Sequence, residues 1–211
     1  QGIGRTVEAA AMVLTAGSPA RPMALLYPVL AHAREPELRA DVQLLRGMAI
    51  QQGGRPMAAF ALLEAEAEQV VEHDRARAAG LLTQGGVALV AHGSMDRLAA
   101  LAERALALAP AEAELVPAVL HASALATLGE HARARTLLRR RHEALRALDP
   151  AGPGHEILAV AALVHVWMED YEDAERLLVW LVETCRERGA IVALAFPLAV
   201  SASLQMRRGS L

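Results

Sequence analysis

Residues 47–54, GMAIQQGG, contain the pattern that decides the fold. A small residue, Gly47, is followed seven positions later by a turn glycine, Gly54. The same step recurs, once in degenerate form, at Ala10 with Gly17, Gly86 with Gly93, Ala122 with Gly129, Ala162 with Glu169, and Ala202 with Gly209. The turn positions follow one another at a nearly regular interval of roughly 40 residues, which is typical of a helical repeat array. The small residue lets a partner helix approach, and the glycine ends the helix in the left-handed conformation.

The composition predicts the same class. Hydrophobic residues make up 54% of the 211-residue chain and aromatic residues only 3%, so the core is expected to consist of Ala, Leu and Val. Few segments alternate as strands do. We therefore predict an all-α fold, a right-handed superhelical stack of antiparallel helix hairpins with about eleven helices, forming a single repeat domain over residues 1–211.

Helix starts and stops can be placed along the chain from Pro, Gly and capping residues. Pro28 predicts a kink in its helix, and Gly85 with Gly86 predicts close packing, a bend or a break. Residues 149–154 predict a loop that lengthens one repeat. The expected helices are 6–16, 22–33, 36 to the glycines at 53 and 54, 56 onward, 75–92, 95–109, 111–128, 131–148, 155–168, 171–188 and 191–206.

Several classes of function lack their sequence signals. The net charge of −3 argues against a nucleic-acid footprint. Six Arg residues between 133 and 146 leave two alternatives for that segment, a phosphate-binding site and a solvent-exposed basic face. The eight His residues include no i, i+4 pair or His-Glu-x-x-His pattern, so no metal site is predicted. No phosphate loop, nucleophile elbow or paired catalytic carboxylates occur. We predict no catalytic residue, and an all-helical enzyme would need a buried pocket with convergent ionisable groups.

The chain has no long apolar run, which argues against a membrane span. It has a single cysteine, Cys185, which favours a cytoplasmic protein. It begins without Met and ends where a partner helix is expected, so we interpret it as part of a longer protein. The last helix then has an uncovered apolar face, which predicts a homo-oligomer through the C-terminal end.

The repeat resembles the tetratricopeptide unit, in which a small residue, a turn glycine and a later Ala mark each hairpin. The matching residues are Gly47, Gly54 and Ala59, then Gly86 and Gly93, then Ala122, Gly129 and Ala134. The units of that family have about 34 residues, and the units here are longer. Leu98 also stands where Ala is expected. The resemblance implies a concave groove lined by the first helix of each pair.

A narrower resemblance covers residues 169–209, with YEDAERLL at 171–178, CRERGA at 185–190, FPLA at 196–199 and RG at 208–209. These segments look like the helical region of bacterial LuxR-type transcriptional regulators of the large ATP-binding class, similar to the maltose-type activators. The resemblance implies a sensory and interaction segment within a transcription factor. It places ATP in an upstream domain and DNA on a C-terminal domain, so this segment needs no cofactor and makes no direct nucleic-acid contact.

The leading hypothesis is a non-catalytic segment that holds a small-molecule inducer, a partner protein or a neighbouring domain in the concave groove. The alternative is a stand-alone peptide-binding scaffold or assembly adaptor unrelated to transcription. For Trp167 the alternatives are an exposed anchor in the groove and simple core packing. The repeat register nominates six groove residues, namely Met48, Gln52, Thr83, Ser123, Thr127 and Trp167.

Overall fold

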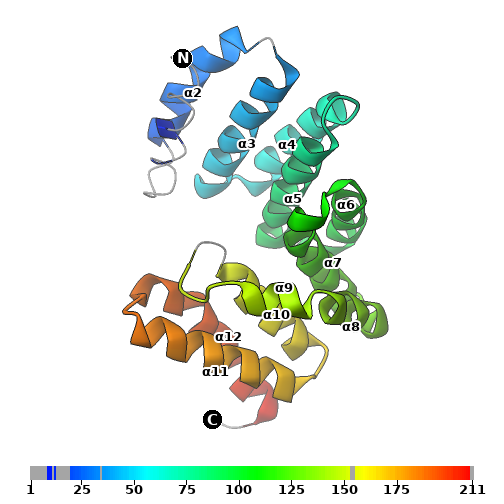
Figure 1. The fold of residues 1–211 in the computed structure, drawn as a ribbon, viewed down its shortest axis with the longest axis vertical. Helices are drawn as coiled ribbons and strands as arrows, with labels where there is room; N and C mark the ends of the chain where they lie inside the picture. Colours follow the sequence, from blue (N-terminus) through cyan, green and yellow to red (C-terminus); the bar gives the residue numbers. More distant parts are fainter. Residues whose placement is uncertain (1–8, 11, 13–19, 34, 153–154, 210–211) are drawn as a thin grey trace. The chain divides into compact units, whose positions relative to one another are not determined.

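A computed structural model describes residues 9–10, 12, 20–33, 35–152 and 155–209 of the chain. Every regular element in these residues is a helix, and none of them forms a strand (Figure 1). The all-α prediction is confirmed. Within the same residues, no helix combines the length and apolar character needed to cross a bilayer. The helices fall into two compact units, residues 1–117 and 118–211.

The first unit consists of successive helices that pack against their neighbours. α3 also contacts α5, so the first helices of consecutive hairpins lie against each other. A small core joins Leu26 and Val29 to Val42 at the α2–α3 contact. The helices are α2 (Ala20–His32), α3 (Pro36–Gln52), α4 (Pro56–Val70), α5 (Arg75–His92) and α6 (Met95–Leu108), followed by the 3₁₀ helix η1 (Ala111–Ala113).

The second unit repeats this arrangement. α11 packs on α10, and α12 contacts both of them (Figure 1). Their shared core includes Ala162, Leu178 and Leu204. The helices are α7 (Leu115–Thr127, from Ala118 onward in this unit), α8 (His131–Arg140), α9 (His142–Ala147), α10 (Glu156–Trp167), α11 (Tyr171–Glu187), the 3₁₀ helix η2 (Ile191–Leu194) and α12 (Ala195–Arg208).

The turn positions adopt the left-handed backbone that the repeat predicts. The φ angles are 77° at Gly54, 86° at Gly93, 84° at Gly129, 63° at Glu169 and 70° at Gly209. At four of these turns the next residue donates its N–H to the carbonyl five positions earlier, as Ser94 does to Leu89 and Asp170 does to His165. This is the hydrogen bond that closes a helix at a left-handed residue. The predicted turn at Gly17 lies outside the described residues.

Glu169 is the one non-glycine with positive φ in the described part of the chain, and it offers a direct test of the turn. A side chain disfavours this conformation by about 1–2 kcal/mol, whereas glycine adopts it freely. Glu169→Gly is therefore expected to raise the free energy of unfolding by about 0.5–1 kcal/mol, measured by urea denaturation. The control Glu172→Gly, inside α11, should lower it by up to about 1 kcal/mol. A loss of stability in Glu169→Gly would contradict this account of the turn.

Three predicted helices are subdivided, two of them at proline. Pro117 and Pro197 are each the third residue of an α-helix, and a 3₁₀ turn precedes both α7 and α12. Proline has no N–H and its ring clashes with the carbonyl four residues earlier, so a regular helix cannot extend back through the predicted starts at 111 and 191.

The predicted helix 131–148 is divided at Arg141, where φ is −109° and ψ is 8°. Arg139 and Arg140 occupy the last turn of α8, where positive charge is favoured, and Glu143 occupies the first turn of α9. No proline or glycine marks this division in the sequence.

α5 continues without interruption through Gly85 and Gly86, which excludes the predicted break. Both glycines are buried. A Cβ on Gly85 would lie 3.6 Å from Leu101 Cδ2 and 3.7 Å from Phe60 Cδ2, so this glycine lies in close contact with α4 and α6. Of the three alternatives, the structure shows close packing. The predicted helix 6–16 falls almost wholly outside the described residues, and Pro28 lies inside α2, where the kink stays a prediction.

Candidate functional site

The first unit has a depression between α3 and α5, the first helices of two consecutive hairpins. Its volume is about 370 Å³, and it opens to solvent. Its lining consists of Ala40, Asp41, Leu44, Asp74, Ala76, Arg77, Gly80 and Leu81. A few polar groups beside apolar side chains are typical of a small-ligand site.

Arg77 is the centre of the polar end of the depression. Its Nε donates to Asp41 Oδ1 at 2.9 Å and its Nη2 to Asp41 Oδ2 at 3.3 Å, which joins α5 to α3. Its Nη1 donates to Asp74 Oδ2 at 2.5 Å, and its backbone N–H donates to Asp74 Oδ1 at 2.9 Å. Asp74 is therefore both the N-cap of α5 and an ion-pair partner.

These contacts fix the charges of the site. The backbone N–H and guanidinium of Arg77 hold the pKa of Asp74 below its ordinary value. Hydrogen bonds to Asp41, and then to Asp74, raise the pKa of Arg77. Asp74 and Arg77 thus stay charged near neutral pH. The two carboxylates and one guanidinium together carry a net charge of −1.

The apolar end of the depression includes Leu44, Leu81 and Gly80. Gly80 is exposed, and a Cβ built there would meet nothing within 4 Å. Space therefore remains over α5 at this position, and a larger side chain would enter it without disturbing the core.

The nominated residues of the first unit lie on the same two helices. Met48 is half-buried and Gln52 exposed on α3, and Thr83 is half-buried on α5 with its hydroxyl donating to the Ala79 carbonyl at 2.7 Å. A hydrogen bond of 2.8 Å from Gln84 Nε2 to Gln51 Oε1 connects the two helices in this region. None of the three nominated side chains lines the depression itself.

The other three nominated residues belong to the second unit. Ser123 is 1% exposed and donates its hydroxyl to the Val119 carbonyl at 2.9 Å, so it is a core residue of α7 and not a surface contact. Thr127 is exposed but donates to the carbonyls of Ser123 and Ala124. Trp167 is half-buried at the end of α10.

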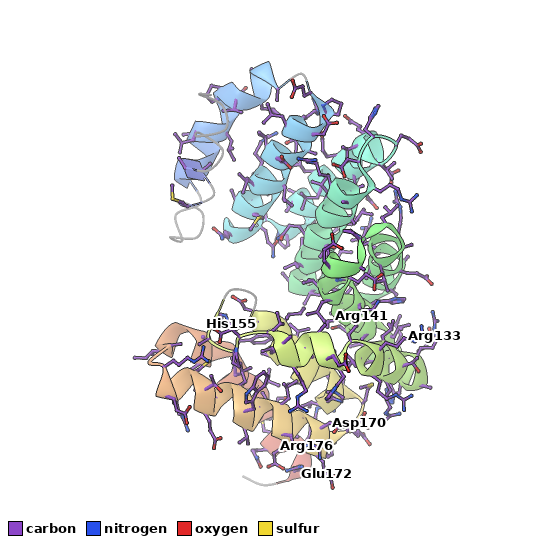
Figure 2. All side chains as sticks on the ribbon, viewed as in Figure 1. Arg133, Arg141, His155, Asp170, Glu172 and Arg176 are labelled. Atoms are coloured by element: carbon purple, nitrogen blue, oxygen red, sulfur yellow. The ribbon has the colours of Figure 1, made fainter. Side chains whose placement is uncertain are left out.

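A second polar group gathers at the start of α11 (Figure 2). One ligand-type atom each from His165, Asp170 and Asp173 lies within 4.8 Å of the other two. Arg135 holds both oxygens of Asp170, with Nη2 to Oδ1 at 2.7 Å, and Arg176 pairs with Asp173. Both carboxylates are already neutralised by guanidinium groups, so this arrangement fits a structural ion-pair network better than a cation site.

The same contacts explain the titration of this cluster. Burial lowers the pKa of His165, and hydrogen bonds from Arg135 lower the pKa of Asp170. Arg135 Nη2 also donates to the Met168 carbonyl at 3.1 Å, so α8 is tied to the turn between α10 and α11. The network stabilises the joint between two hairpins.

Sequence reasoning missed Asp41, Asp74 and Arg77, the charged residues of the depression. Asp41 lies in the helix that precedes Gly54, and Arg77 lies in the helix that ends at Gly93. Opposite charges on the first helices of consecutive repeats were therefore the available signal. Most of the nominations instead lie near the C-terminal ends of the first helices, and Thr83 lies in the middle of α5.

These features define the chain as a set of antiparallel helix hairpins with left-handed turns and a small charged depression. Comparison of the chain with protein-family models, with curated proteins and with solved structures finds no match.

Proposed function

We propose that the chain is a non-catalytic binding segment, in which the first helices of the hairpins form the surface that holds a small-molecule inducer, a partner protein or a neighbouring domain. The observation that carries the proposal is the α3–α5 depression. Its charged groups bind one another and its other lining is apolar, so it is suited to hold a ligand and not to transform one.

The chemistry of the depression favours a particular kind of ligand. Two carboxylates outnumber the guanidinium, and Asp41 remains 43% exposed. A cationic or hydrogen-bond-donating group is expected to contact Asp41, with an apolar part over Leu44 and Gly80.

We further propose that the segment belongs to a LuxR-type regulator of the large ATP-binding class and acts in the cytoplasm, with ATP and DNA bound by other domains. The residues that support this resemblance occupy α11, its C-terminal turn and α12. The genomic reading frame that encodes the chain tests it. An ATPase upstream and a helix-turn-helix downstream support a regulator, and their absence favours a stand-alone scaffold.

Binding is tested by thermal-shift screening of the protein against small metabolites and short basic peptides, since a ligand of the folded state raises the melting temperature. The affinity of each ligand found in the screen is then measured for two variants, Gly80→Phe, whose new side chain fills the depression, and Asp41→Asn. Both variants are expected to weaken binding at least about tenfold, which corresponds to about 1.4 kcal/mol.

Ala61→Phe is the matched control, because Ala61 is exposed on α4, outside the depression. It should leave the affinity unchanged. Ligands that bind Gly80→Phe as tightly as the original protein would show that the depression is not the site. A peptide hit, with no metabolite hit, would favour the scaffold over an inducer sensor.

A further inference from the structure

α12 has an apolar face that its neighbours leave open. Pro197, Val200 and Leu204 are buried against the rest of the second unit. On the opposite side Leu198 is 42% and Met206 65% exposed, and Ala199 and Ala202 are exposed as well. We call Leu198, Ala199, Ala202 and Met206 the open face of α12.

The same positions are fully covered in α10. When the left-handed turn at Gly209 is aligned with the one at Glu169, the open face corresponds to Leu158, Ala159, Ala162 and Val166. All four are 0% exposed. Ala162 and Val166 share a core cluster with Ala174 and Leu178 of α11, the helix that follows their turn.

From this correspondence we infer that the open face of α12 is a docking site for one amphipathic α-helix of the α11 type, lying antiparallel to α12. Its small fourth residue takes the place of Ala174 and packs against Ala202. Its leucine one turn later takes the place of Leu178 and, because the two helices are antiparallel, packs near Leu198. The site continues the α10–α11–α12 core in the same register.

Charge favours the same occupant. α12 ends with Arg207 and Arg208, of which Arg207 is exposed. α11 carries Glu172 and Asp173 in its first turn. A helix of this type, antiparallel to α12, places its acidic first turn beside the basic last turn of α12, where unlike charges and both helix dipoles are favourable.

The test uses a peptide of residues 170–188 with Cys185→Ser and a fluorescent N-terminal label, titrated with the full chain and followed by anisotropy. Saturable 1:1 binding is expected. Ala202→Arg or Met206→Arg in the protein should weaken it at least about tenfold, or about 1.4 kcal/mol. A peptide carrying Leu178→Arg should fail to bind.

Leu128→Arg is the matched control in the protein, since Leu128 is a 48% exposed apolar residue outside α12. It should leave peptide binding unchanged, and circular dichroism melts should show that all variants stay folded. Absence of saturable binding to the folded chain overturns the inference, as does binding that Ala202→Arg does not affect.

Sedimentation of the unlabelled chain tests whether a second copy of the chain, and not a separate helix, covers the open face. A dimer that Ala202→Arg dissociates overturns the chosen occupant, because a second copy would then cover the open face. The outcome is independent of the proposed function, whose test depends on Gly80 and Asp41 of the first unit.

Discussion

Gly47→Ala is expected to lower the free energy of unfolding by about 1–3 kcal/mol, because the added methyl group overpacks the contact between α3 and α4. A Cβ at this position would lie 2.5 Å from Leu63 Cδ2 and 2.6 Å from its Cγ. Leu63 is fully buried, so it has no solvent side to move toward. The clash outweighs the gain of about 0.5–1 kcal/mol that alanine normally brings to a helix interior.

Gly80→Ala is the matched control for this prediction. Gly80 also lies inside a helix, but it is exposed and a Cβ there meets no atom within 4 Å. This variant should gain about 0.5–1 kcal/mol. Urea denaturation of both variants measures the difference, and a Gly47→Ala protein as stable as the original would show that Leu63 yields without cost.

Arg39→Leu is expected to cost about 2–3 kcal/mol, because it removes the charge partner of a buried carboxylate. Glu66 is 3% exposed, and Arg39 Nε donates to its two oxygens at 2.9 and 3.1 Å. Without Arg39, Glu66 keeps a weaker hydrogen bond from Gln43 Nε2 at 3.4 Å. Arg39 is itself 42% exposed on its side chain, which keeps the expected cost below that of a fully buried pair.

Arg104→Leu provides the comparison. Arg104 pairs with Glu68, and both side chains are largely exposed, at 40% and 53%. Removing this pair should change the free energy of unfolding by less than about 1 kcal/mol. Equal losses in the two variants, measured by the same denaturation experiment, would mean that burial of Glu66 does not decide its energetic role.

The repeat step predicted the hairpins well because its two residues act locally. A left-handed residue ends a helix through its own φ angle, and a small residue sets how close the partner comes, so Gly93 and Gly129 could be placed without tertiary knowledge. Even Glu169 was placed, although its side chain disfavours the conformation.

Long-range polar pairs could not be predicted in the same way. Glu66 lies on a different face of its helix from the exposed acidic residues around it, and this could have singled it out. Its partner Arg39, however, is 27 residues away in the sequence. The Asp41–Arg77 pair spans 36 residues. Such contacts depend on how far one helix is shifted along its neighbour, which helix periodicity does not specify. Ser123 failed as a surface nomination because its side chain is only 1% exposed, and helix periodicity did not show that this face is covered.

Cys185 gives this protein a native reporter of local opening. It is the only cysteine of the chain, it is 0% exposed, and its thiol donates to the Pro150 carbonyl at 3.2 Å. Burial also raises its pKa, so the closed form contains little reactive thiolate. The rate of thiol alkylation then reports how often α11 and the segment around Pro150 separate by local opening, and no label has to be introduced.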